Sequence, residues 1–195
     1  NGIAGTKTYV PYDKGDKDGN RWYAPTPYYI EWSRDNVKFL KENSGKKGEG
    51  MPVVRNPQFY FREGFCWNNV LSDEKIKCRL KEKSVYSTEA MTFISLIPEI
   101  ANDYYLICLL NSAFLGNYRM DFINVSHHLT TGDAKEFPII IPTSDQLKQF
   151  EGIFNRAYNI QKSKFEGKIS EVEAENQLEV IQKELDEMVE GMYMN

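Results

Sequence analysis

The chain has 195 residues, of which 41% are hydrophobic and 27% are charged. This balance is typical of a globular protein and excludes a disordered one. No run of 18 apolar residues occurs, so we expect no membrane-spanning helix and no membrane partner. The net charge of −4 arises in the tail, since residues 1–141 carry 18 basic and 17 acidic side chains and residues 142–195 carry 6 and 11. The nearly neutral body neither indicates nor excludes a nucleic-acid partner.

Short strand-like segments dominate the first 100 residues. Residues 6–12 (TKTYVPY) alternate in polarity, and residues 21–32 (RWYAPTPYYIEW) have an aromatic strand composition broken by two prolines, which suit sheet edges. Residues 33–45 predict a helix, capped at its start by Ser33 and ended by Gly45.

Three further segments have the pattern of strands. They cover residues 58–71, 76–87 and 91–98. Many short strands separated by turns predict a curved, mainly antiparallel sheet with a few helices, which is an α+β fold and not a βαβ array.

The apolar period changes to that of helices after residue 100. Residues 102–123 predict a core helix with Asn102 or Asp103 as its cap. After it come the only two histidines, in the stretch NVSHHLTTGDAKEFPIIIP (residues 124–142). We expect its last part to be a core strand that anchors the polar histidine loop through Phe137, Ile139 and Ile141.

The tail predicts a C-terminal α-helical hairpin. One helix follows Ser144, and Ser170 with Glu173 forms a capping box for the second. The second helix carries an apolar stripe of Leu178, Ile181, Leu185, Met188 and Met192. Because two short heptads are marginal alone, we favour a hairpin within the chain over helix-mediated self-association. The expected division is therefore residues 1–142 and 143–195.

The cysteines indicate neither disulfides nor a metal site. Cys66, Cys78 and Cys108 are odd in number and form no C-x-x-C pair, which predicts reduced, partly buried thiols in a cytoplasmic protein. A zinc site of Cys66, Cys78, His127 and His128 is disfavoured, because the spacing is not that of structural zinc sites.

The segment NPQF (residues 56–59) is similar to the Asn-Pro-Pro-Tyr/Phe loop of DNA amino-group methyltransferases, which binds a flipped base. Gln58 replaces the second proline, and the chain has no glycine-rich strand-to-helix turn for S-adenosylmethionine. We therefore expect a turn at this segment, and no catalytic residue, metal or cofactor in the chain itself.

Polar, aromatic and basic side chains gather at the expected loop–strand junctions. Arg and Asn make paired hydrogen bonds to guanine and adenine edges, and Lys and Ser bind phosphates. Taken singly, each of these residues is more often a solvated surface residue than a DNA contact, and a tryptophan is more often a core residue than a DNA contact. The candidate DNA-binding residues are Arg21, Tyr23, Arg62, Trp67, Asn68, Asn69, Arg79, Lys81, Lys83, Ser126, His127 and His128.

In this order the segments resemble the C-terminal target-recognition region of adenine-specific DNA methyltransferases, particularly those fused into Type IIG restriction–modification enzymes. The matching segments are GNRWYAPTPYYIEW, FYFREGFCWNNV, IKCRL, YYLICLLNSAFLGNYRM, INVSHHLTTGDAKEFPIIIP and IQKELDEMVEGMYMN. Val125, His127 and His128 depart from the family's Pro-Thr-x-x-aromatic pattern, so base contacts in this loop cannot be copied from relatives.

The resemblance implies a sequence-specific reader of double-stranded DNA. It implies a histidine loop that faces DNA, and an upstream methyltransferase domain of the same chain, with or without an endonuclease, that uses S-adenosylmethionine. We therefore expect a non-catalytic piece of a longer protein. Three alternatives stay open: half of a Type I restriction specificity subunit, a helical protein-interaction module without DNA contact, and a catalytic domain that uses NPQF.

Overall fold

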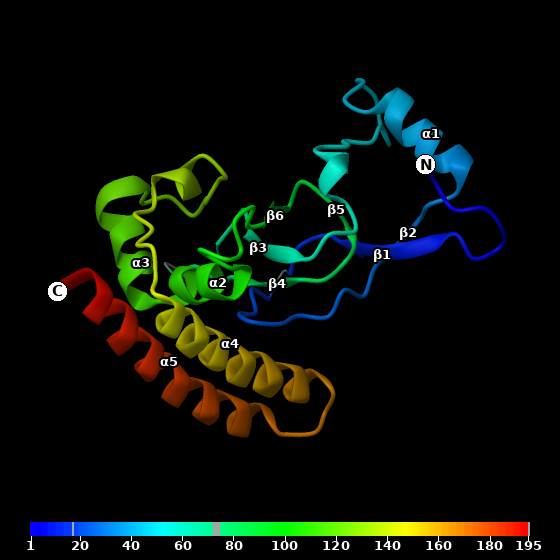
Figure 1. The fold of residues 1–195 in the computed structure, drawn as a ribbon. Coiled ribbons are helices and arrows are strands. Elements are labelled where there is room, and N and C mark those ends of the chain that lie inside the picture. The colour runs from blue at the N-terminus through cyan, green and yellow to red at the C-terminus, as the bar shows by residue number, and fades with distance from the viewer. Residues whose placement is uncertain (17, 72–74, 195) are drawn as a thin grey trace.

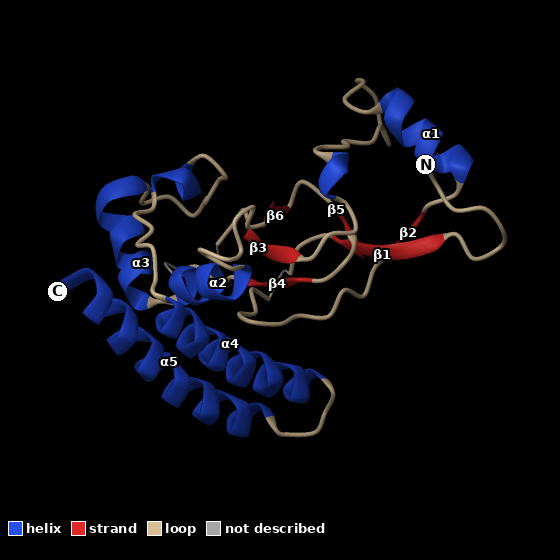
Figure 2. Ribbon diagram, in the orientation of Figure 1, coloured by secondary structure: helices blue, strands red, loops and turns tan. Residues whose placement is uncertain are grey.

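The computed structural model describes residues 1–16, 18–71 and 75–194. Its strands form two small open sheets in the middle of the molecule, and helices lie on both sides of them (Figures 1 and 2). This confirms the α+β class and the mainly antiparallel pairing, although the strands divide into two sheets where one curved sheet was expected. None of the helices in these ranges is both long and apolar enough to cross a membrane.

The first sheet has the order β2-β1-β5. Its central strand β1 (Tyr9–Asp13) pairs antiparallel with β2 (Tyr29–Glu31) and parallel with β5 (Val85–Tyr86). A small core lies beside it, formed by Val10, Tyr60 and Val85. Since Val10 and Val85 belong to β1 and β5, this core packs Tyr60 against the sheet.

Helix α1 (Arg34–Asn43) follows β2, and Ser33 caps it as predicted, because its hydroxyl accepts from the Asn36 amide at 3.2 Å. After α1 the chain returns through residues 44–56 to a short 3-10 turn, Pro57–Phe59. The segment NPQF therefore forms a turn, as expected, but a strand does not follow it directly.

The second sheet has the order β4-β3-β6 and is antiparallel throughout. Strand β3 (Gly64–Asn68) lies between β4 (Arg79–Lys81) and β6 (Ala90–Phe93). Gly64 permits the close approach of β6, since a side chain there would collide with the Phe93 carbonyl. The sheet packs on α2 and contributes to the main core.

The expected helix over residues 102–123 is divided. Asn102 caps α2 (Asp103–Asn111), and Ser112 ends that helix and caps α3 (Ala113–Tyr118) through its hydroxyl. A π-helical turn, Arg119–Ile123, leads into the histidine loop. The break at Ser112 arises because its side chain competes for backbone hydrogen bonds, as short hydroxyl side chains do.

The helical hairpin is confirmed. Helix α4 (Ser144–Phe165) and helix α5 (Glu171–Met194) lie side by side (Figure 1). Thr143, one residue earlier than predicted, forms a capping box with Gln146. The apolar stripe of α5 faces its own chain, because Ile181 and Leu185 are buried. Since α2 packs on α4 and α3 on α5, the hairpin shares the main core.

The expected core strand after the histidine loop is wrong. Phe137 is buried, but Ile139 and Ile141 are 41% and 64% exposed, and residues 137–142 form no strand. The two prolines in FPIIIP lack the N–H groups that a sheet needs. Tyrosine hydroxyls hold this segment instead, since Tyr105 donates to the Ile140 carbonyl at 2.6 Å and Tyr193 donates to the Pro138 carbonyl.

Candidate nucleic-acid interface

The histidine loop, residues 124–133, has a tightly fixed backbone. The Asp133 carboxylate accepts from the amide of Thr130 at 2.7 Å and from its hydroxyl at 2.8 Å. The Asn124 side chain accepts from the Ser126 amide at 2.8 Å and donates to Asp133 at 3.3 Å. Buried Arg119 donates to the Ser126 carbonyl from below. The loop thus holds its shape through its own polar side chains.

The histidine loop is also joined to the chain that follows β3. The Leu71 amide donates to the His127 carbonyl at 2.7 Å, and the Leu129 amide donates to the Asn69 carbonyl at 2.9 Å. Leu129 is fully buried and anchors this pairing. The side chains of Ser126, His127 and His128 are left exposed on a backbone that these hydrogen bonds hold.

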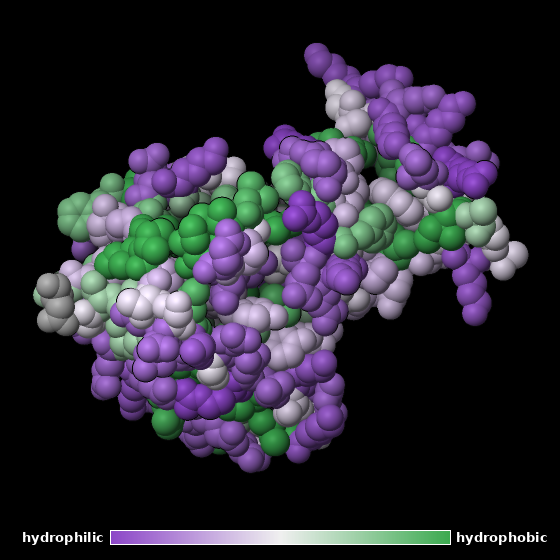
Figure 3. Space-filling view, viewed as in Figure 1, coloured by the Kyte–Doolittle hydropathy of each residue, from purple (hydrophilic) through white to green (hydrophobic). Residues whose placement is uncertain are grey.

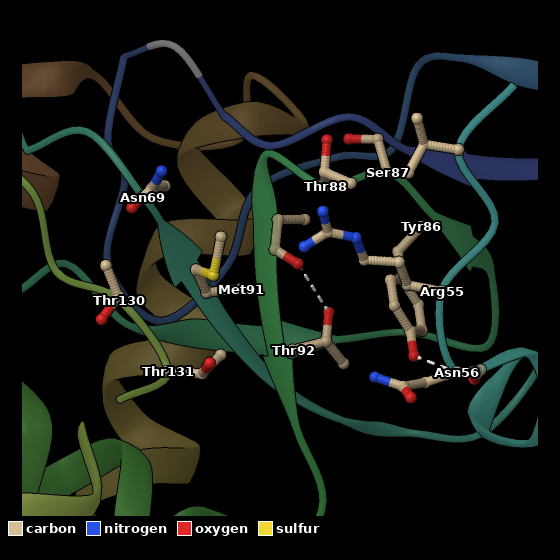
Figure 4. A pocket seen from close by; sticks show the side chains of 12 residues that line it. Arg55, Asn56, Asn69, Tyr86, Ser87, Thr88, Met91, Thr92, Thr130 and Thr131 are labelled. Carbon is tan, nitrogen blue, oxygen red and sulfur yellow. Dashed lines mark hydrogen bonds between the residues drawn. The ribbon is translucent and has the colours of Figure 1, made fainter. Parts of the chain in front are cut away.

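Beside the histidine loop lies a hollow of about 340 Å³, which we call the polar cleft (Figure 4). Four separate segments of the chain form its walls. Its lining residues are Val53, Arg55, Asn56, Asn69, Tyr86, Ser87, Thr88, Ala90, Met91, Thr92, Thr130 and Thr131. Among these described residues none is acidic, and Arg55 carries the only formal charge. The cleft is therefore suited to a polar or anionic ligand.

Three candidate DNA-binding residues lie in the interior. Trp67, Arg79 and Lys81 are 1%, 4% and 1% exposed. The Trp67 indole donates to the Leu129 carbonyl at 2.9 Å and so supports the histidine loop. The Lys81 ammonium donates to the carbonyls of Arg62, at 2.8 Å, and Glu82. The expectation that these three side chains face DNA does not fit this placement.

Two more candidates pack against the hairpin. Arg21 donates to the Gln182 side chain on α5. The Tyr23 ring makes T-shaped contacts with two rings of α4. Its centroid lies 5.3 Å from that of Tyr158 and 5.8 Å from that of Phe165. These contacts attach residues 21–23 to the hairpin, which gives both side chains a structural role.

The Asn-Asn pair divides between two environments. The Asn68 amide is used within the chain, since its oxygen accepts from the Asp16 amide at 2.9 Å and its nitrogen donates to the Asp16 carbonyl. Asn69 lines the polar cleft, with its side-chain oxygen buried and without a partner among the described residues.

The remaining candidates are exposed but do not share one cavity. His127 lines a groove of about 750 Å³ next to α3 and α5. Lys83 and Arg62 are exposed near the end of β4, where Arg62 lies over the Phe59 ring at 5.7 Å. Three of the candidates therefore lie in different surroundings, since Arg79 is buried, Asn68 is bonded to Asp16 and His127 lines the groove beside α5.

Sequence reasoning missed the wall of the cleft that Arg55 and Asn56 supply. Arg55 stands alone in a loop and belongs to none of the predicted junctions. A signal was present in the composition, because residues 33–55 carry six basic side chains and three acidic ones. This segment, with α1 at its centre, is called the basic lobe below.

The buried thiols are not nucleophiles. Burial raises the pKa of Cys66 to about 12, and it raises the pKa of Cys78 and Cys108 well above the ordinary value. All three are free and fully enclosed. Within the described ranges, no three His, Cys, Asp or Glu side chains gather as metal ligands.

The chain is similar to part of a known protein. It is 25% identical over 138 residues to the adenine-specific methyltransferase BrxX of Escherichia coli O9:H4 (strain HS). The chain is thus similar to part of an adenine-specific methyltransferase. The matched region covers 70% of this chain but only 10% of BrxX, so the chain spans about a tenth of the length of that relative. No protein-family model matches the chain.

Proposed function

We propose that this chain recognises a specific sequence in duplex DNA and positions the duplex for the catalytic domain of an adenine-specific methyltransferase. The observation that carries the proposal is the histidine loop, in which three exposed polar side chains stand on a backbone fixed from within. A pre-organised loop loses little conformational entropy when it binds, which favours specific recognition. The similarity to BrxX supports a role in a protein that transfers methyl groups to adenine.

Charge indicates which side of the molecule meets DNA. The hairpin lies away from the basic lobe (Figure 1), and residues 142–195 carry the whole acidic excess. The exposed acidic side chains of α5 include Glu171, Glu173, Glu175, Glu179, Glu187 and Glu190. Because like charges repel, phosphates are directed away from the hairpin, and from the groove that His127 shares with Glu175 and Glu179, toward the polar cleft.

The contact residues proposed here are exposed, apart from the half-buried Asn69. Ser126, His127 and His128 supply donors and acceptors at the histidine loop, and Asn69 supplies an amide at its edge. Exposed Lys83 and Arg62 are placed as outlying phosphate contacts. Trp67, Arg79 and Lys81 support this surface from inside.

The catalytic partner also has a candidate surface. A hydrophobic band crosses the face shown in Figure 3, over the segment that leads into α4. Ile139 and Ile141 in that segment, and Leu96 and Ile97 before α2, are between 41% and 73% exposed. Exposed apolar groups of this kind mark protein interfaces, and we assign them to the methyltransferase domain of the same polypeptide.

The methyl donor S-adenosylmethionine is assigned to that domain. Among the residues that the structure describes, Asn56 and Pro57–Phe59 form an isolated turn without a glycine-rich strand-to-helix loop beside it, which does not fit that donor. We propose that methyl transfer takes place outside this chain, which alone is expected to be inactive.

The test is binding of the 195-residue chain to labelled duplex DNA, measured by fluorescence anisotropy. We expect His127→Ala with His128→Ala to weaken specific binding about tenfold, equivalent to about 1.4 kcal/mol. Lys183→Ala, an exposed change on α5, is the matched control and should leave affinity unchanged. Equal affinity of the wild type and the double variant would contradict the assignment of the loop.

A further inference from the structure

We infer that the polar cleft binds a phosphate of the DNA backbone, and that the Arg55 guanidinium is the cation that pairs with this phosphate. The inference rests on the proposed function and extends it, because it adds a site from which no base is read. Its central residue, Arg55, lies outside the histidine loop, and no sequence pattern singled it out.

The backbone on both sides of Arg55 is held in place. Before it, the Val54 amide donates to the Ser44 hydroxyl at 2.9 Å, and that hydroxyl donates to the Val54 carbonyl at 3.2 Å. After it, Asn56 turns the chain in the left-handed region with a φ of 49°, and its carbonyl accepts from the Tyr86 hydroxyl at 3.3 Å. Arg55 is thus an exposed side chain on a fixed support.

The guanidinium of Arg55 extends into the cleft (Figure 4). It has no hydrogen-bond or ion-pair partner among the residues that the structure describes. By contrast, Arg21, Arg79 and Arg156 each donate to a side chain of this protein. Arg55 therefore keeps its donors for a ligand.

The hydroxyls of Thr92 and Thr130 donate to Ala90 and Asp133, but other polar groups of the cleft keep donors that the described chain does not use. The hydroxyls of Ser87, Thr88 and Thr131 donate to no acceptor within the described part of the chain. Asn69 buries its side-chain oxygen, so its amide group offers a ligand only the NH₂. Since a phosphate oxygen accepts and never donates, whereas a base edge presents both kinds of group, this set of donors fits a phosphate better than a base.

The surroundings extend the positive charge beyond the cleft. The basic lobe leads directly into Arg55, and its exposed side chains include Arg34, Lys38, Lys41, Lys46 and Lys47. A DNA strand whose phosphate occupies the cleft can therefore continue along this lobe. Contacts of this kind set the register of a protein on the duplex, while base contacts elsewhere determine the sequence that is read.

The experiment is the salt dependence of duplex binding by the 195-residue chain between 50 and 200 mM salt. One phosphate contact contributes a slope of about −0.9 in a plot of log K against log salt. We expect Arg55→Gln to make the slope shallower by about 0.9 and to weaken binding by the same factor for every duplex. Arg55→Lys should keep the slope, because it keeps the charge.

Arg156→Gln is the matched control, since it removes the same charge from the exposed face of α4. It should leave the slope unchanged. The inference is overturned if Arg55→Gln leaves the slope as it is, or if it changes the preference at one base pair only. It is also overturned if inorganic phosphate, titrated into the chain by calorimetry, binds at micromolar concentration, because the cleft would then serve a free phosphate compound.

The two proposals fail in different ways. If the wild type binds no duplex, the proposed function is wrong, and so is the inference that the polar cleft binds a DNA phosphate. If the wild type binds duplex DNA and Arg55→Gln binds it with the same affinity and salt dependence, only the inference about the polar cleft is wrong. Thermal unfolding followed by circular dichroism verifies that the variants fold, and Arg55 is exposed.

Discussion

Arg79 forms an ion pair with Asp13 in the interior, with 2.8 Å between Nη2 and Oδ1 and with the side chains only 5% and 6% exposed. Asp13 ends β1 in the first sheet, and Arg79 begins β4 in the second. Arg79 also donates to the Cys66 sulfur on β3. Although burial opposes its charge, Cys66 and Asp13 raise the pKa of Arg79 above its ordinary value. The pair therefore joins the two sheets.

Arg79→Ala is expected to destabilise the fold by about 3–5 kcal/mol, because it leaves the Asp13 carboxylate buried without its partner. Urea unfolding followed by tryptophan fluorescence measures the change. Arg156→Ala breaks an exposed ion pair on the hairpin and should cost at most about 1 kcal/mol.

The double variant Asp13→Leu with Arg79→Met tests the cause of that loss. Replacing both buried charges with apolar groups is expected to recover most of the stability. If Arg79→Ala instead leaves stability unchanged and abolishes DNA binding, then Arg79 contacts DNA and its interior assignment is wrong.

The shape of the histidine loop should depend on pH through Asp133. Partial burial raises its pKa, but the hydrogen bonds from Thr130 and Asn124 lower the pKa further, to below the ordinary value. A carboxylate with a lowered pKa stabilises the folded state above the unfolded value of about 3.9. That contribution is lost as the pH falls through the folded value.

We therefore expect the Thr130 amide resonance, measured by NMR, to stay constant from pH 8 to about pH 4.5 and to move only in stronger acid. Asp133→Asn removes this acid transition. A shift of the same resonance at a pH well above about 4.5 would mean that a group other than Asp133 orders the loop.

The hairpin should unfold together with the rest of the chain. Leu185 is fully buried in the shared core, so Leu185→Ala is expected to lower the free energy of unfolding by about 2–5 kcal/mol. Val180→Ala, on the same helix but 66% exposed, should change it by less than about 0.5 kcal/mol. Loss of the helical signal at lower urea than the tryptophan signal would contradict a single cooperative unit.

Features set by neighbouring residues were predictable from the sequence. The Ser33 cap, the Ser170 cap and the stripe of α5 are local patterns with a fixed period, and each occurs in the structure. The prediction that Ile139 and Ile141 lie in a core strand was wrong. An apolar run between prolines resembles a buried strand, but a sheet also requires backbone N–H donors, which prolines lack.

The candidate site was less predictable, because distant parts of the chain form it. Arg79 and Lys81 lie in a run of basic residues that reads as a surface patch. The inward direction of Arg79 follows from Asp13, 66 residues away in the sequence, and that of Lys81 follows from the Arg62 carbonyl. The polar cleft joins Arg55, Asn69, Thr88 and Thr131 from four segments, and no spacing in the sequence relates them.

The most direct test of the central claim is selection of duplex DNA from a randomised pool by the 195-residue chain, followed by sequencing. We expect the wild type to enrich one short sequence, and the His127→Ala with His128→Ala variant to lose the preference at one or more positions of it. Enrichment of no sequence by the wild type, at low as well as moderate salt, would contradict the account.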